Sequence, residues 1–145
     1  MYAYLYLELS KLGIEYIGES QLVGYPTQYP SVSMVNWETG KPNARFRVLE
    51  LLKHNFGPGD GLVSTRVDGA GIAAQAYRTA AGRKLLLINR RGAAVDVELP
   101  SEEADARMDS VDAASGENPP RSCQVSGTRV SLLPFSVAVI SSRAP

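Results

Sequence analysis

The chain has 145 residues, and its fifteen lysine and arginine residues are balanced by fifteen aspartate and glutamate residues. Domains that bind nucleic acid or an anionic membrane usually carry a basic surface, so this balance argues against both kinds of partner. No apolar run reaches the roughly 20 residues that a membrane span needs. Cys123 is the only cysteine, which excludes an internal disulfide and a cysteine-based metal site.

The N-terminal segment is apolar on most of its sides. Its side chains recur at helical spacing and end at a glycine, which is typical of a helix terminus: Tyr2, Leu5, Leu9, Leu12 and then Gly13. The segment lacks the basic leader and the small-residue cleavage site of a signal peptide. We therefore expect a helix that is buried by more than one neighbour, one of which lies outside this chain.

A strand and a long loop follow this helix. Ile14–Ile17 has the composition of a short strand, Glu19–Pro30 is punctuated by glycine and proline, and Ser31–Trp37 is extended or turn-like. Helix, strand, loop and helix is the order of an α/β repeat, in which active groups lie on the loop after the strand.

The clearest helix in the sequence is predicted over Lys41–Phe56. Pro42 suits the first turn, because its missing N–H would have no partner inside the helix there. An apolar stripe follows at helical spacing: Ala44, Val48, Leu49, Leu51, Leu52 and Phe56. Gly57-Pro58-Gly59-Asp60 ends the helix, with glycine in the left-handed cap conformation and proline blocking a further turn.

The spacing of apolar residues is no longer helical after Asp60, and the remainder of the chain is predicted to form strands joined by turns. The expected strands are Leu62–Val67, Ile72–Thr79, Lys84–Asn89, Ala94–Leu99, Arg107–Val111, Ser122–Val125, Arg129–Leu133 and Ser136–Ser141. Asp68-Gly69-Ala70-Gly71 indicates a hairpin turn rather than a phosphate-binding loop. The fold class is therefore α+β, with an antiparallel β-sandwich of about seven or eight strands.

Two of the strands indicate how the sandwich is covered. The continuous apolar run Leu85–Ile88 fits a central strand that is covered on both faces. Val95, Val97 and Leu99 alternate with Asp96 and Glu98, which predicts one face in water.

Catalytic and metal constellations are not evident. His54 is the only histidine and stands in the last turn of the predicted helix, which favours a structural or solvated role over a triad. A group of carboxylates matches no metal-loop spacing and predicts a solvated acidic edge: Glu102, Glu103, Asp105, Asp109 and Asp112. We expect no catalytic residue, no metal and no cofactor in this chain.

The loop Glu19–Pro30, together with Trp37, combines aromatic rings with amides and a carboxylate. Rings stack on the C–H faces of sugars, whose hydroxyls need paired donors and acceptors. The candidate sugar-binding residues are Glu19, Gln21, Tyr25, Gln28 and Trp37. The alternative is that the aromatic residues only pack the loop onto its neighbours.

Residues 18–60, with the later LLLINRRG and SLLPFSVAVI, resemble the C-terminal end of glycoside hydrolase family 39 and related proteins. The resemblance implies that residues 1–60 are the terminal helix-strand-helix unit of a (β/α)8 barrel and that residues 61–145 are a β-sandwich domain. It also implies that the parent protein hydrolyses O-glycosidic bonds with two carboxylates about 5 Å apart. Both carboxylates would lie upstream of Met1, so this chain alone is expected to be inactive.

The implied partners are an oligo- or polysaccharide and the missing N-terminal barrel portion of the same protein. An extracellular or periplasmic location would follow from the parent family. Two alternatives stay open at this point. The sandwich could be a noncatalytic carbohydrate-binding or structural module, or the chain could be a small freestanding protein whose helices cap the sandwich. The aromatic residues of the sandwich, Tyr77 and Phe135, are a poor supply for a sugar-stacking platform.

Overall fold

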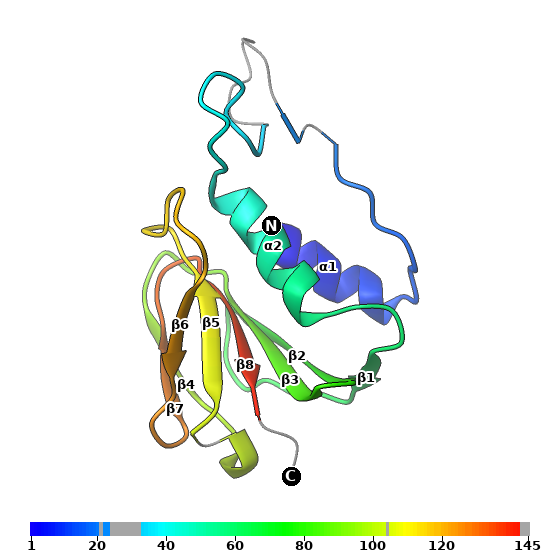
Figure 1. The fold of residues 1–145 in the computed structure, drawn as a ribbon. Coiled ribbons are helices and arrows are strands. Elements are labelled where there is room, and N and C mark those ends of the chain that lie inside the picture. The colour runs from blue at the N-terminus through cyan, green and yellow to red at the C-terminus, as the bar shows by residue number, and fades with distance from the viewer. Residues whose placement is uncertain (21, 24–32, 104, 143–145) are drawn as a thin grey trace.

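The computed structural model describes residues 1–20, 22–23, 33–103 and 105–142. In this part of the chain two helices precede eight strands, so the predicted α+β class with an antiparallel sandwich is confirmed (Figure 1). The helices are α1 (Tyr2–Lys11) and α2 (Ala44–Asn55), and a 3-10 turn, η2, spans Ser101–Glu103. The strands are β1 (Gly61–Val63), β2 (Ile72–Thr79), β3 (Gly82–Asn89), β4 (Val95–Glu98), β5 (Arg107–Val111), β6 (Arg121–Gln124), β7 (Arg129–Leu132) and β8 (Val137–Ser141).

The molecule is built in three layers. Six strands form a sheet in the order β1-β2-β3-β8-β5-β6, and β4 pairs with β7 in a separate two-stranded ribbon. The two helices cover one face of the sheet and the ribbon covers the other (Figure 1). Leu86 and Ile88 of β3 face the helices, while Leu85 and Leu87 face the ribbon. The prediction that this strand is covered on both faces is therefore confirmed.

The burial of the outer strand β4 agrees with the alternation of apolar and charged residues in its sequence. Val95 and Val97 are half-buried, with Val97 packed against the core under the ribbon, whereas Asp96 and Glu98 are exposed. Alternation of apolar and charged residues is what a strand with one wet face requires.

Helix α2 begins later than the sequence predicts and ends without a glycine cap. The Asn43 side chain accepts hydrogen bonds from the N–H groups of Arg45 and Phe46, at 3.0 and 3.4 Å, so Asn43 is the N-cap and Pro42 lies before the helix. At the other end Phe56 leaves the helix in an extended conformation. The prediction of a left-handed glycine cap was wrong, because the Phe56 ring turns into the core between the helices and the sheet.

The segment Ile14–Ile17 is not a strand. It runs out from α1 without a ladder partner, and all four of its residues are exposed. An extended segment needs a neighbouring strand to satisfy its backbone groups, and the described residues supply none.

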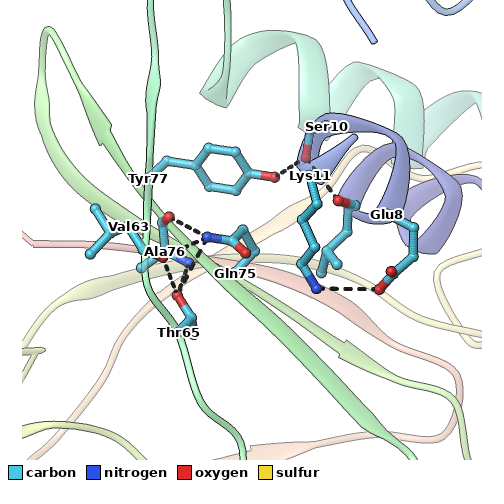
Figure 2. Close-up of polar contacts among 9 residues, drawn as sticks. Glu8, Ser10, Lys11, Val63, Thr65, Gln75, Ala76 and Tyr77 are labelled. Atoms are coloured by element: carbon cyan, nitrogen blue, oxygen red, sulfur yellow. Dashed lines mark hydrogen bonds and ion pairs between the residues drawn. The ribbon is translucent and has the colours of Figure 1, made fainter. Parts of the chain in front are cut away.

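The strand predicted over Leu62–Val67 is also shorter than expected. It stops at Val63, and residues 64–71 form a wide connection to β2 in place of a tight hairpin turn. Side chains replace the ladder here, because the N–H of Ala76 donates to Thr65 Oγ1 at 2.9 Å and Gln75 Nε2 donates to the Val63 carbonyl at 2.7 Å (Figure 2).

The predicted acidic edge is only partly solvated. The side chain of Glu103 is 4% exposed and pairs with Arg83 at 2.7 Å, and that of Asp112 is 3% exposed and pairs with Arg121 at 2.6 Å. Sequence spacing could not identify these two partners, since Arg83 lies on β3 and Arg121 on the edge strand β6.

Candidate functional site

Two of the five predicted sugar-binding residues, Glu19 and Trp37, lie in the described part of the chain, while Gln21, Tyr25 and Gln28 lie outside it. Glu19 is exposed, and its carboxylate accepts a 3.4 Å hydrogen bond from the Tyr2 hydroxyl. Trp37 stands in a tight turn that Asn36 stabilises by accepting the N–H groups of Glu38 and Thr39 at 2.9 and 2.8 Å. Trp37 is 48% exposed.

Glu19 lies at a groove between the two helices. The groove has a volume of about 430 Å³ and is lined mostly by apolar side chains of α1 and α2, among them Leu5, Leu9 and Leu49. The lining residues include Glu19 but not Trp37. Of the two predicted site residues that the structure describes, this groove therefore holds Glu19 alone.

A second cavity adjoins this groove and was not anticipated from the sequence. It measures about 650 Å³ and lies between the segment Gly13–Ile17 and the connection Phe56–Asp60 that leads into β1. We call it the junction pocket, since it lies where the helical part of the chain meets the sandwich. Its walls include Tyr6 and Ser10 of α1 and Tyr77 of β2.

Aromatic rings form the floor of the junction pocket. The Phe56 and Tyr77 ring centroids lie 4.5 Å apart, and Tyr6 lies 5.9 Å from Phe56 and 6.3 Å from Tyr77. Such tilted pairs stabilise one another beyond the area that they bury. The sequence carried one signal for this cluster, because Phe56 ends the apolar stripe of α2, but nothing in the spacing linked Tyr6 to Tyr77.

The hydroxyl of Tyr77 is held by α1. Ser10 Oγ lies 2.8 Å from the Leu7 carbonyl and 3.1 Å from the Tyr77 hydroxyl (Figure 2). A serine hydroxyl has one proton, and a carbonyl can only accept, so Ser10 donates to Leu7 and Tyr77 donates to Ser10. The Tyr77 oxygen keeps a lone pair that can accept a further hydrogen bond.

Both phenols are protonated over the physiological range. Burial, with smaller contributions from Tyr77 and Asp60, raises the pKa of Tyr6 to about 12. Burial also raises the pKa of Tyr77, and its hydrogen bond with Ser10 opposes that shift. Asp60 lines the junction pocket together with both tyrosines, and its negative charge adds to both shifts.

A larger, polar hollow of about 1060 Å³ lies beyond the C-terminal end of α2. It is lined by His54, Asn55 and Lys84, and by polar residues of β5, β6 and β8. The Lys84 ammonium donates to Asn55 Oδ1 at 2.8 Å, and burial lowers its pKa. The lining of this hollow carries both positive and negative side chains. His54 is exposed at its rim, as the sequence predicts for a solvated residue.

Within the described residues, no three histidine, cysteine, aspartate or glutamate side chains come together as metal ligands. No helix that the structure describes is long and apolar enough to cross a membrane.

Comparisons with known proteins agree with this description of the sandwich. Residues 69–140 match the family model of the D-apionate lactonase C-terminal immunoglobulin-like domain. Among curated protein sequences none matches the chain.

The fold is similar to that of two solved xylanases. One is a GH30 endoxylanase from Clostridium papyrosolvens C71, with a TM-score of 0.61 and 19% identity over 76% of this chain and 30% of that protein. The other is the glycoside hydrolase family 30 subfamily 8 xylanase Xyn30A from Clostridium acetobutylicum, with a TM-score of 0.62 and 15% identity over 79% of this chain and 31% of that protein. The chain thus spans about a third of the length of each enzyme.

Proposed function

We propose that this chain is the C-terminal part of a glycoside-hydrolase-like protein, in which residues 1–60 complete a (β/α)8 barrel and residues 61–145 form an accessory β-sandwich. The parent protein hydrolyses O-glycosidic bonds with two carboxylates that lie upstream of Met1. The likeness in fold to two xylanases, about a third of whose length this chain spans, supports this placement. Assignment to family 39 is the finer form of the proposal and rests on the resemblance of residues 18–60.

The observation that carries the proposal is the exposed apolar surface on one side of the helical part. Ile14 and Ile17 are 46% and 47% exposed, Tyr16 is 90% exposed, and Leu5 on the adjoining face of α1 is 45% exposed. Contiguous apolar surface of this kind marks an interaction site. It is the surface that a preceding barrel unit would cover.

The backbone of the same segment supports the same partner. Among the described residues no hydrogen bond reaches the N–H or C=O groups of Glu15, Tyr16 or Ile17. A row of unpaired groups in an extended segment is a template for a further strand. In a closed barrel a neighbouring strand would satisfy these groups, and Ile14–Ile17 would become the last strand of the barrel.

Within that protein, the loop after this strand would contribute to the sugar site. Glu19, Gln21, Tyr25, Gln28 and Trp37 would line the subsite nearest to the last strand, with Trp37 stacking on a sugar face and Glu19 accepting hydroxyl protons. These residues bind substrate and do not act as acid, base or nucleophile.

The experiment is to sequence the reading frame upstream of Met1, to express the longer product, and to measure sugar release from xylan. The longer protein should be active, and the 145-residue chain should release no sugar. In the longer protein, Trp37→Ala and Glu19→Gln should raise KM about tenfold with kcat within threefold. Each removes an interaction that stabilises the bound substrate and the transition state equally. Trp37→Phe is the matched control and should retain most of the stacking. Hydrolysis by the 145-residue chain, or a stop codon followed by a start at Met1, would overturn the proposal.

A second candidate follows from the match of residues 69–140 to the C-terminal domain of a lactonase. In that case the parent protein opens a sugar-acid lactone, and the sandwich has the same accessory role. The two candidates separate in one assay of the longer product, because lactone opening releases acid in a pH-stat while glycoside hydrolysis releases reducing ends.

A further inference from the structure

The junction pocket offers hydrogen-bonding groups that the protein itself does not use. Among the described residues no hydrogen bond is made by the Tyr6 hydroxyl, although Tyr6 lines the pocket. The N–H of Gly57 donates to Asp60 Oδ2 at 2.8 Å, which leaves the other carboxylate oxygen, Oδ1, without a hydrogen bond from the described residues. Tyr77 adds a lone pair, since its proton is donated to Ser10.

These groups form a set of one donor and two acceptors around the same space. The Tyr6 hydroxyl can donate, and the Tyr77 oxygen and Asp60 Oδ1 can accept. All three residues line the same cavity, and both hydroxyls are protonated at neutral pH. A ligand that satisfies the set must both accept and donate, as a hydroxyl does, and two adjacent hydroxyls would satisfy all three groups at once.

The walls of the pocket favour a ligand with an apolar face as well as hydroxyls. Phe56 and Tyr77 line the pocket and are only 8% and 2% exposed, so most of each side chain is buried in the core. In the 145-residue chain Tyr16 is 90% exposed at the rim, with Ile14 and Ile17 beside it. A ring at the rim and hydroxyl-binding groups at the floor suit a pyranose or furanose ring, whose C–H face stacks while its hydroxyls point inward.

The negative charge of the pocket favours neutral saccharides over anionic ones. The negative charges that line the pocket are those of Asp60 and Glu15, and no lysine or arginine is among its lining residues. A carboxylate or phosphate group on the ligand would be repelled and would leave Asp60 Oδ1 unpaired, which costs free energy in a partly buried site. A neutral sugar has no such penalty.

We propose that the junction pocket binds a neutral saccharide through a vicinal diol, with Tyr6 donating to one hydroxyl and Asp60 and Tyr77 accepting protons from the diol. The site is separate from the predicted subsite on the loop after Glu19, and it lies within the 145-residue chain. It would let the junction between the helical part and the sandwich hold a sugar chain independently of hydrolysis.

The test is a titration of the 145-residue chain with xylotriose and cellotriose as neutral probes and with glucuronate as the anionic probe, followed by NMR of the backbone amides. One neutral probe should saturate shifts at Tyr6, Ser10 and Asp60 with a Kd in the millimolar range or below, and glucuronate should not. Tyr6→Phe and Asp60→Asn should each weaken binding about tenfold, since each removes one hydrogen bond while keeping the shape of the side chain. Tyr4→Phe is the matched control on the same helix, where the ring lies under the Arg90 guanidinium and outside the pocket, and its Kd should stay within twofold.

Several results would overturn the proposal. The pocket does not bind sugar if neither neutral probe shifts these amides at 50 mM, a concentration about fivefold above a Kd of roughly 10 mM. The assignment of the groups is wrong if a probe binds equally to the wild type, Tyr6→Phe and Asp60→Asn, with circular dichroism showing all three folded. Activity of the longer protein on xylan is a separate readout, so this proposal and the proposed function can fail independently.

Discussion

Asn43 fixes the start of α2 through three hydrogen bonds of one side chain. Its Oδ1 accepts the N–H groups of Arg45 and Phe46, and its Nδ2 donates to the Ser33 carbonyl at 2.7 Å. Asn43→Ala should lower the free energy of unfolding by about 1–2 kcal/mol, as loss of an N-cap usually does. Urea unfolding measures the change. Asn118→Ala, at an exposed turn, is the control and should change stability by less than about 0.5 kcal/mol; equal effects at both positions would contradict the role of the cap.

The raised pKa of Tyr6 should make the free energy of unfolding fall at alkaline pH. Its pKa is about 12 in the folded protein against an ordinary value of 10.0, so the stability it contributes is full below pH 10 and is lost as the pH rises towards 12. The loss should be about 1–2 kcal/mol, reduced from the full shift because the ring is only partly buried.

Tyr6→Phe has no phenol proton to lose, so its curve of unfolding free energy against pH should be flatter between pH 10 and 12. Urea unfolding at pH 9, 10, 11 and 11.5 gives both curves. Lys84 titrates in both proteins and cancels in the difference, whereas the difference includes the interaction between Tyr6 and Tyr77. Parallel curves for the two proteins would show that the pKa of Tyr6 is not raised by folding.

The side chains of the central strand β3 are buried on both faces of the sheet. Leu86 faces the helices at 0% exposure and Leu87 faces the ribbon at 2% exposure. Leu86→Ala and Leu87→Ala should therefore each cost about 2–5 kcal/mol in unfolding free energy. Leu62→Ala on the edge strand β1, where the side chain is 46% exposed, should cost under about 1 kcal/mol. If Leu87→Ala were as mild as Leu62→Ala, the ribbon would not cover the sheet in solution.

The elements that the sequence predicts correctly are those whose signal is local. Leu85–Ile88 is apolar without interruption because two layers cover it, and Val95–Glu98 alternates because one layer does. Ile14–Ile17 has the same strand-like composition and yet is unpaired, since pairing depends on a neighbour that composition does not encode. The exit of α2 was mispredicted because the burial of Phe56 between the helices and the sheet is a tertiary contact.

At the scale of the whole molecule, the candidate site also combines residues that can be chosen from the sequence with contacts that only the fold creates. Glu19 and Trp37 could be chosen by residue type, but whether they share a cavity depends on how the chain folds between them. The junction pocket could not be predicted, because Tyr6 lies far from Asp60 and Tyr77 in the sequence and meets them only when α1 packs on β2.

The exposed apolar side of the helical part has a consequence in solution. Leu5, Ile14, Tyr16 and Ile17 should bind an apolar fluorescent dye and promote self-association of the 145-residue chain at high concentration. Sedimentation velocity over a concentration series measures the association. Tyr16→Ser with Ile17→Ser should suppress it, whereas Leu133→Ser on the far side of the sandwich should not. A strictly monomeric chain that binds no dye would favour a freestanding small protein.

The central claim is that this chain is one part of a longer protein, and the most direct measurement is the intact mass of the native protein, captured with an antibody against residues 61–145 and mapped by its N-terminal peptide. The account predicts a mass well above 15.6 kDa, with peptides that continue upstream of Met1. A native protein of 15.6 kDa that begins at Met1 would contradict it.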